Sequence, residues 1–245
     1  MNIFITGGTT GIGLELVKLY LAEGHNVGLC GRDLDKLPDD FIQKHDNLFV
    51  FETDVTNNTI LQETVKKFVY TVNGKLDLLI ANAGISIFNK QSIPDFNIAK
   101  QIINTNVIGV LNSFEAAMQW MLPENKGHLV AIASVAGMIG LPGAAAYSAS
   151  KAAVLKLCES HAIDLKKHGI NVTAIAPGFI DTPLTRKNNH ATPFIMDASK
   201  AATKIKKAIE KKKYLYIFPF TMKIIIYILE KMPRRIYRRL MQLVS

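Results

Sequence analysis

The chain lacks the residues that would mark a secreted, metal-binding or membrane-spanning protein. Its two cysteines, Cys30 and Cys158, lie far apart in apolar surroundings without a metal-ligand spacing. No cationic region followed by a long apolar segment opens the sequence. The most apolar run, Phe220 to Leu229, is far short of the ~20 residues that a transmembrane helix needs. We therefore expect a cytoplasmic protein with buried free thiols and no bound metal.

Positive charge is also scarce in most of the chain. Residues 1–199 hold 16 lysines and arginines against 18 acidic residues, whereas residues 200–245 hold 13 against two. The net charge of +9 therefore belongs to the C-terminal tail, and the rest of the chain has no long-range field for nucleic acid. Few aromatic residues interleave the cations of the tail, so nucleic-acid binding is not favoured there either.

What the chain does contain is an alternation of short apolar runs with helix-length amphipathic segments. The apolar runs are Ile3 to Ile5, Asn26 to Cys30, Leu48 to Phe51, Leu76 to Ala81, His128 to Ala133, Asn171 to Ala176 and Tyr214 to Ile217. Helical stretches lie near 11–23, 57–72, 95–121, 143–168 and 198–211. Continuous apolar strands separated by helices predict one α/β domain with a parallel sheet covered on both faces.

A glycine-rich turn, from Thr6 to Gly13, follows the first predicted strand. Glycines at this place permit a tight turn and let backbone N–H groups approach a pyrophosphate at the positive end of the next helix. Any sharp connection between a strand and a helix can use such glycines. Their position after the first strand of an α/β pattern nevertheless favours dinucleotide binding.

Tyr147 and Lys151 lie four residues apart in a stretch that is predicted to form one long helix, so they share a face. A free tyrosine, with a pKa near ~10, exchanges protons poorly at neutral pH. A cation beside it favours the phenolate and moves the pKa toward the working range. The pair is typical of proton-transfer chemistry, although the same spacing occurs by chance on many exposed helices.

Taken together, the motifs resemble the short-chain dehydrogenase/reductase family over about residues 1–217. Gly7 and Gly11 are separated by three residues, as in that family, and Asn82-Ala83-Gly84 after the fourth strand matches its Asn-Ala-Gly turn. Further matches follow in the family's order, namely Asp54-Val55, Asn106, Ser134, the Tyr147 and Lys151 pair, Pro177-Gly178 and Thr182. We therefore expect a doubly wound Rossmann fold with a seven-stranded parallel sheet in a single domain.

The resemblance implies a role for each of four catalytic residues. Tyr147 would exchange a proton with the substrate oxygen during hydride transfer, while Ser134 holds that oxygen in place. Lys151 would favour the phenolate and bond the nicotinamide ribose, and Asn106 would hold a water that links Lys151 to bulk solvent. In the alternative reading, Ser134 merely bonds the backbone at a strand end and Asn106 faces solvent on a helix.

The expected dinucleotide site lies along the carboxyl ends of the strands. Within it, Asp54 and Val55 would contact the adenine, and Thr182 would bond the carboxamide, as the resemblance implies. The full set is Gly7, Thr9, Thr10, Gly11, Ile12, Gly13, Arg32, Asp54, Val55, Asn82, Ala83, Gly84, Tyr147, Lys151, Pro177, Gly178, Ile180 and Thr182.

The end of the second strand bears on the choice between NAD and NADP. An acidic residue there usually accounts for a preference for NAD, but this chain has Gly31 followed by Arg32. Arginine can donate two charge-assisted hydrogen bonds to a phosphate, so we expect NADP(H) to be preferred over NAD(H). Asp33 follows directly and is a candidate ion-pair partner for Arg32. Alternatively, Arg32 is a solvated loop cation.

The C-terminal part departs from the short family pattern. Residues of about 184–198 are polar and irregular and are expected to form a substrate lid, in which His190 is exposed or touches a ligand. Residues 218–245 form a basic extension that ends in a predicted helix from Arg234 to Val244. One face of that helix carries Ile236, Tyr237, Leu240, Met241, Leu243 and Val244, and the other carries Arg234, Arg235, Arg238 and Arg239. This pattern is typical of a helix in a membrane interface, and equally of one that packs on the domain or on a second subunit.

The sequence thus predicts an NADP(H)-dependent oxidoreductase that interconverts a carbonyl and an alcohol, with an apolar or lipid-like substrate. The family resemblance implies a homodimer or homotetramer paired through the helices near 95–121 and 143–168. The tail would close one side of the substrate crevice or dock the enzyme at the inner face of a membrane. The alternative function is a non-catalytic NADP(H)-binding sensor or a membrane-surface scaffold.

Overall fold

A computed structural model describes residues 1–38, 40–87, 93–187 and 192–243 of the chain. Its centre is a parallel sheet of seven strands in the order β3-β2-β1-β4-β5-β6-β9. The strands are β1 (Asn2–Thr6), β2 (Asn26–Gly31), β3 (Leu48–Glu52), β4 (Leu78–Ala81), β5 (Gly127–Ile132), β6 (Ile170–Pro177) and β9 (Leu215–Phe218). Each corresponds to one of the predicted apolar runs, so the sheet is confirmed.

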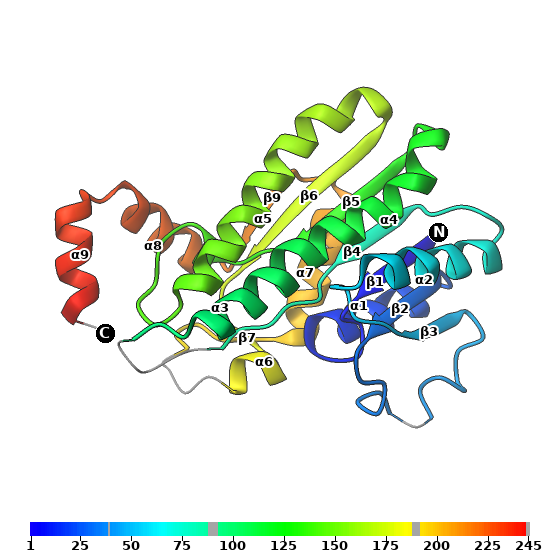
Figure 1. Ribbon diagram of the computed structural model, residues 1–245, viewed down its shortest axis with the longest axis horizontal. Helices are drawn as coiled ribbons and strands as arrows, with labels where there is room; N and C mark the ends of the chain where they lie inside the picture. The colour runs from blue at the N-terminus through cyan, green and yellow to red at the C-terminus, as the bar shows by residue number, and fades with distance from the viewer. Residues whose placement is uncertain (39, 88–92, 188–191, 244–245) are drawn as a thin grey trace.

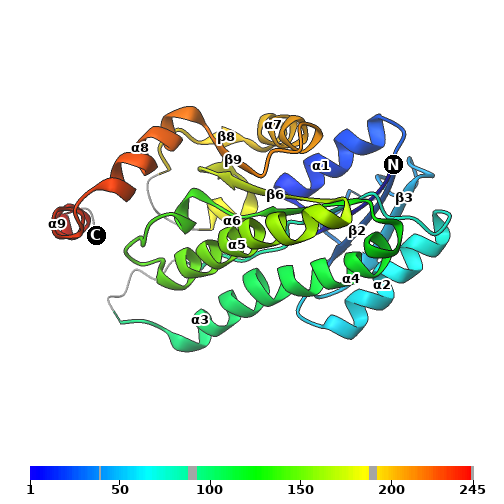
Figure 2. The same cartoon turned by 90° about the horizontal axis from the view of Figure 1, so that it is seen from above.

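Helices cover both faces of this sheet (Figures 1 and 2). Those on one face are α2 (Asn58–Thr71), α4 (Gly109–Glu124) and α5 (Ala145–Asp164), and those on the other are α1 (Gly11–Ala22) and α7 (Ala198–Glu210). Side chains alternate along a strand, so Phe4 packs in the first layer while Ile3 and Ile5 pack in the second. Because both faces of the sheet are buried, the strands have continuous apolar sequences and no alternation of apolar and polar residues.

The order of the strands reverses between β1 and β4. From β1 the chain winds outward through β2 and β3, and it then returns to add β4 on the other side of β1. A crevice opens outside the carboxyl ends of the strands at such a reversal, and it is the usual ligand site of this architecture. The doubly wound prediction is therefore confirmed.

The predicted helix near 95–121 is interrupted by a wider turn. It consists of α3 (Phe96–Ile103), a π-helical turn over Asn104–Ile108, and then α4. Asp95 begins α3, because its carboxylate accepts hydrogen bonds from the N–H groups of Asn97 and Ile98. A π-helical turn frequently marks a functional position, and this one contains Asn106.

The C-terminal extension forms two helices, α8 (Phe220–Lys231) and α9 (Arg234–Leu243). They lie at the end of the molecule toward which the strands point (Figure 1). Met222, Ile226 and Tyr237 are buried against Val135 and Ile139, in a third apolar cluster that lies apart from the two main ones. Among the described residues, no helix has the length and apolar character needed to cross a membrane.

Candidate active site

The glycine-rich turn between β1 and α1 is tightly packed. Gly7 and Gly11 have φ values of +64° and +57°, which side-chain-bearing residues rarely adopt. A Cβ atom on Gly13 would overlap the carbonyl oxygen of Gly7. The Asn82 side chain fixes the turn by donating hydrogen bonds to the carbonyl oxygens of Thr6 (3.1 Å) and Gly7 (2.9 Å).

The start of α1 is suited to an anion. The helix begins at Gly11 after Thr10, whose side chain makes no capping hydrogen bond, and the first turn has no acidic residue. Its N-terminal N–H groups therefore remain available, at the positive end of the helix dipole. A pyrophosphate fits this arrangement of donors and close-packed glycines.

A cleft of about 320 Å³ runs along the carboxyl ends of the strands. Every residue that the sequence placed in the site lines this cleft, except Gly13 and Asn106. Gly13 lies beneath the turn, where it allows the close packing described above. The cleft is also lined by residues that the prediction did not include, most of which are next to a predicted residue in the sequence: Gly31, Asp33, Lys36, Thr53, Ile85, Thr105, Ile132, Ala133, Pro183, Leu184, Thr185 and Lys187.

Ser134, Tyr147 and Lys151 come together at one end of the cleft. The Tyr147 hydroxyl lies close to the Ser134 side chain. The Ser134 oxygen accepts from the N–H of Ala136 at 3.1 Å and donates to the carbonyl of Pro177 at 3.5 Å. The Lys151 ammonium lies 5.8 Å from the centre of the Tyr147 ring and donates to the carbonyl of Ile132 at 2.8 Å. The folded chain therefore joins the end of β5 to the first turns of α5 at this point.

Burial changes the proton affinity of both groups on α5. It raises the pKa of Tyr147, and the hydrogen bond with Ser134 opposes part of that rise. Burial lowers the pKa of Lys151 to about 8. We expected the neighbouring cation to dominate the pKa of Tyr147, but the loss of hydration has the larger effect. Lys151 instead becomes a group that gains and loses its proton near neutral pH.

Asn106 is completely buried beside this group. Its amide nitrogen donates to the carbonyl of Ile85 at 2.9 Å and to the Ser150 hydroxyl at 3.0 Å, and its oxygen accepts from the N–H of Ile85 at 2.8 Å. The reading of Asn106 as a solvent-facing helical residue is therefore wrong. The π-helical turn places it against the loop that follows Asn82-Ala83-Gly84.

Two cations lie at the opposite end of the cleft. Arg32 is 61% exposed, and its guanidinium lies 4.0 Å from the Asp54 carboxylate. Asp33 pairs with Lys36 at 2.6 Å, and this hydrogen bond holds the pKa of Asp33 below its usual value. The proposed pair of Arg32 with Asp33 is therefore wrong. The presence of Lys36 three residues after Asp33 is the signal in the sequence that could have indicated the correct partner.

The described parts of the expected lid region contain short regular elements. The Thr182 hydroxyl accepts a hydrogen bond from the N–H of Thr185 at 3.3 Å and begins the short helix α6 (Pro183–Arg186). The strands β7 (Ile180–Asp181) and β8 (Met196–Asp197) pair in parallel. His190 lies outside the described residues.

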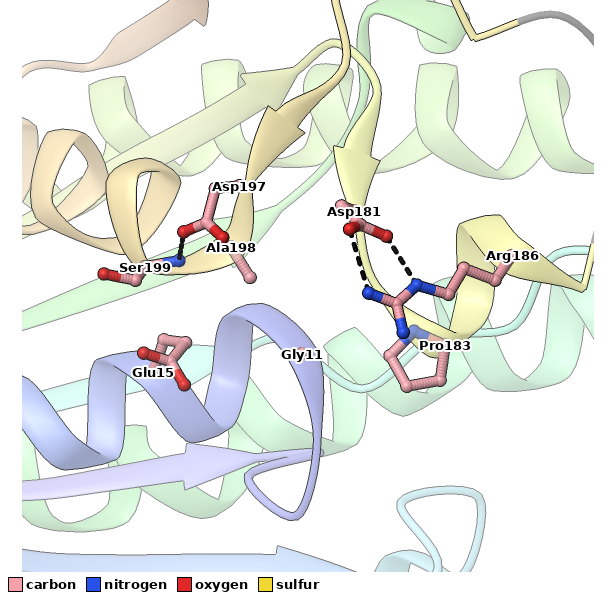
Figure 3. Close-up of a pocket in the computed structure, with 8 residues that line it drawn as sticks. All are labelled: Gly11, Glu15, Asp181, Pro183, Arg186, Asp197, Ala198 and Ser199. Atoms are coloured by element: carbon pink, nitrogen blue, oxygen red, sulfur yellow. Dashed lines mark hydrogen bonds and ion pairs between the residues drawn. The ribbon is translucent and has the colours of Figure 1, made fainter.

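A second hollow, of about 270 Å³, lies beside the lid (Figure 3). It is bordered by the start of α1 at Gly11, by α6 and by the first residues of α7. Arg186 spans its edge and donates to both carboxylate oxygens of Asp181, at 2.6 and 2.9 Å. This exposed ion pair links α6 to β7 close to Thr182.

Neither cysteine belongs to the site. Cys30 and Cys158 are buried, and burial raises the pKa of each thiol to about 12. They are therefore protonated and unreactive at neutral pH. Within the described residues, no group of three or more histidine, cysteine, aspartate or glutamate side chains is placed to hold a metal ion.

Known proteins resemble this chain in sequence and in structure. An uncharacterized oxidoreductase of Myxococcus xanthus is 34% identical over 220 residues, which cover 88% of this chain and 86% of the relative. An uncharacterized oxidoreductase of Staphylococcus aureus is 33% identical over 222 residues, or 89% and 95% of the two chains. Among solved structures, ElxO with NADP bound has a TM-score of 0.79 and 26% identity, over 88% of this chain and 96% of that one.

A short-chain dehydrogenase/reductase from Burkholderia phymatum in complex with NAD has a TM-score of 0.84 over 94% of this chain and 93% of its own. At 22% identity it demonstrates the shared fold. The family model described as short chain dehydrogenase matches residues 1–193. The chain therefore belongs to the short-chain dehydrogenase/reductase family, and it is an oxidoreductase that acts on CH–OH groups with NAD(P).

Proposed function

We propose that this enzyme interconverts a carbonyl and an alcohol with NADP(H), on an apolar or lipid-like substrate. The observation that carries the proposal is the position of Tyr147 beside Ser134 at one end of the cleft, with the Lys151 ammonium near the tyrosine ring. Two neighbouring hydroxyls suit the oxygen atom of a carbonyl or an alcohol.

The three side chains would divide the proton transfer between them. Tyr147 would donate its proton to a carbonyl oxygen, or accept one from an alcohol in the reverse direction. Ser134 would position that oxygen, because its hydroxyl already lies within hydrogen-bonding reach of the tyrosine. Lys151, with a pKa of about 8, would hold or release a proton near neutral pH. The bound dinucleotide would supply or remove the hydride.

Asn106 would connect this group to solvent through a water molecule. Both hydrogens of its amide are used, on Ile85 and Ser150, but its oxygen retains a second lone pair. Gly84 borders the same space, since a Cβ atom there would lie 3.2 Å from the Asn106 oxygen and 3.5 Å from the Lys151 nitrogen. The missing side chain of Gly84 leaves room for a contact that joins the two.

The dinucleotide would lie along the cleft with its pyrophosphate at the start of α1. Asn82 and Gly13 would maintain the turn, and Asp54 and Val55 would border the adenine end. Arg32 would bind a 2′-phosphate, because its guanidinium is largely exposed and lines the cleft. The one acidic residue adjacent to it in sequence, Asp33, is already paired with Lys36, which removes much of its repulsion toward a phosphate.

An apolar substrate is supported by the surroundings of Ser134. Apolar side chains line the cleft that contains this residue, among them Ile85, Ile132 and Leu184. Side chains of this kind favour a substrate whose binding removes apolar surface from water.

The proposal is tested by measuring the oxidation of NADPH with a panel of short-chain and long-chain aldehydes and ketones. We expect turnover to fall by about 10²–10⁴-fold in Tyr147→Phe, because the hydroxyl is the proton donor. Tyr70→Phe provides the matched control, since Tyr70 is 65% exposed on α2 and should retain full activity. The affinity for NADPH, measured by the fluorescence of NADPH, should be similar in the wild type, Tyr147→Phe and Tyr70→Phe.

Turnover that survives in Tyr147→Phe would contradict the assigned role of Tyr147. Tight NADPH binding without turnover of any substrate in the panel would favour the alternative of a non-catalytic sensor. A higher kcat/KM with NADH than with NADPH would contradict the proposed cofactor preference.

We also propose that two copies pair through the long helices. Ile103 at the end of α3, Ile108 at the end of the π-helical turn and Ile163 near the end of α5 are 37%, 39% and 73% exposed in the single chain. Pairing would remove these side chains from water. Ile163→Asp should then lower the molar mass measured by light scattering, and an unchanged mass would contradict this interface.

A further inference from the structure

The C-terminal extension has an inner face and an outer face. The inner face, defined by Met222, Ile226 and Tyr237, is buried against the segment that follows Ser134. The outer face is defined by Phe220, Ile224, Ile228, Ile236 and Leu240, which are 72%, 45%, 55%, 56% and 37% exposed. Both α8 and α9 therefore place large apolar side chains in water, although each helix already has a buried side.

The inner face holds the extension in a fixed position. The Tyr237 hydroxyl donates to the carbonyl of Gly140, 97 residues earlier in the chain, and Arg234 lies over the Tyr237 ring. Met138, Leu141, Leu229 and Met241 surround this contact. Because α9 is anchored in this way, the apolar side chains of its outer face cannot turn inward without breaking the buried cluster.

Positive charge accompanies the exposed apolar side chains. Residues 218–245 contain six lysines and arginines and a single acidic residue. Within the described part of the chain, Arg235, Arg238 and Arg239 form no ion pair, and all three are exposed. A helix that combines apolar residues with unpaired arginines lies favourably at the boundary between lipid headgroups and acyl chains.

The outer face is located at the same end of the molecule as the catalytic residues. The strands point toward this end, where α8 and α9 lie opposite the start of α3 (Figures 1 and 2). Phe96 at the start of α3 and Phe194 within the expected lid are 71% and 56% exposed. The extension thus packs on the segment that directly follows Ser134, at the end of the sheet where the strands end.

We propose that the outer face of α8 and α9 binds an anionic lipid surface, and that this contact directs the substrate end of the cleft toward the membrane. The second part rests on the proposed function, because it assumes that the substrate is a lipid-like carbonyl or alcohol that enters from the bilayer. The first part concerns binding alone and does not depend on turnover.

The positive charge of α9 favours a lipid surface over a second copy of the chain as the partner that covers the outer face. Pairing two outer faces would bring the arginines of one α9 close to those of the other, and no acidic residue of α9 would offset their repulsion. An anionic bilayer neutralises the arginines and buries the apolar side chains at the same time. In this arrangement the helices lie along the membrane surface and do not cross the bilayer. The length of α8 agrees with this, because 12 residues are too few to span the bilayer.

The test is flotation of the full-length protein with vesicles of phosphatidylcholine, with and without phosphatidylglycerol. We expect binding to the anionic vesicles only. The quadruple variant Ile224→Gln, Ile228→Gln, Ile236→Gln and Leu240→Gln should bind about tenfold or more weakly, since it removes the apolar contribution. Arg238→Gln with Arg239→Gln should weaken binding roughly fivefold for each charge removed, and added salt should have a similar effect.

Ile60→Gln is the matched control, because Ile60 is 47% exposed on α2 and distant from the tail in sequence, and it should bind like the wild type. Circular dichroism and thermal melts verify that each variant is folded. Absence of binding by the wild type, equal binding to neutral vesicles, or full binding by the quadruple variant would each overturn the proposal. A lower molar mass of the quadruple variant in solution would overturn it in favour of a second copy.

Turnover is measured separately to distinguish the two proposals. The quadruple variant should reduce a short, water-soluble carbonyl at the wild-type rate but lose activity on a long-chain substrate presented in anionic vesicles. Equal loss on both substrates would overturn the link between docking and substrate entry. Vesicle binding by an inactive protein would leave the docking surface intact while contradicting the proposed function.

Discussion

The cleft and the outer face of the C-terminal extension differ in how their side chains are held. In the cleft and directly behind its lining, Asn82 and Asn106 are fixed by several hydrogen bonds each, and Gly13 packs against backbone. On the outer face, Ile224 and Ile236 extend into water. A site that must align reacting groups is rigid because small displacements reduce the rate of catalysis. A surface that meets a fluid bilayer depends on which side chains it exposes, apolar and cationic, more than on their exact positions. The difference predicts that substitutions will be poorly tolerated in the cleft and well tolerated on the outer face.

The largest effect is expected where the cleft is packed most closely. Gly13→Ala introduces a methyl group against the Gly7 carbonyl and the Asn82 amide. We expect a loss of about 1–3 kcal/mol in the free energy of unfolding, as in other overpacked sites, together with weaker binding of NADPH. Chemical denaturation and fluorescence titration measure the two effects.

Gly140→Ala is the matched control, because a Cβ atom there meets nothing within 4 Å. It should leave the free energy of unfolding within about 0.5 kcal/mol of the wild-type value. If Gly13→Ala behaved in the same way, the cleft would be no more constrained than the rest of the surface.

The next largest effect is expected from the positive charge of Arg32, at the end of the cleft where the adenine would bind. Arg32→Glu should lower the ratio of kcat/KM for NADPH to that for NADH by about 10–100-fold, because it removes charge-assisted hydrogen bonds and adds repulsion. Lys18→Glu makes the same change of charge on the exposed side of α1, where Lys18 pairs with Glu15 at 2.8 Å. A comparable fall in Lys18→Glu would show that overall charge, and not contact at Arg32, determines the preference.

A third prediction concerns pH. Burial lowers the pKa of Lys151 from 10.5 to about 8, so between these values the unfolded chain binds more protons and stability rises with pH. Lys151→Met removes a buried charge. It should therefore increase the free energy of unfolding by about 1–3 kcal/mol below pH 8, and this gain should disappear as the pH approaches 10.5.

Thermal melts across this range measure the trend. Lys156→Met on the same helix is the control, because the Lys156 side chain is 81% exposed and has no burial penalty to relieve. A gain that stayed constant with pH would indicate better packing of methionine and would contradict the electrostatic explanation.

The smallest effects are expected for substitutions of two adjacent residues of α9. Tyr237 is 7% exposed and bonded to Gly140, whereas Ile236 is 56% exposed. Tyr237→Phe should lower the free energy of unfolding by about 0.5–1.5 kcal/mol through the lost hydrogen bond. Ile236→Gln should change it by less than about 0.5 kcal/mol. Equal losses in the two variants would mean that α9 has no distinct inner and outer faces.

Much of the fold and of the site was accessible from the sequence because its signals are local. The seven strands follow from apolar runs, the turn before α1 from its glycines, and the shared face of Tyr147 and Lys151 from helical periodicity. The order of these motifs along the chain identified the family. The assignment of catalytic and cofactor-binding roles to individual residues stays a prediction, since it is turnover and binding that test it.

The sequence by itself determined the type of sheet, the position of the cleft and the residue types within it, because each depends on neighbours a few positions apart. Only the tertiary structure decided which partners those residues take. Asp33 pairs with Lys36, Asn106 is buried against Ile85, and Tyr237 reaches Gly140 across 97 residues. It also decided which face of the extension is buried, since an amphipathic pattern records that a face is apolar but not what covers it.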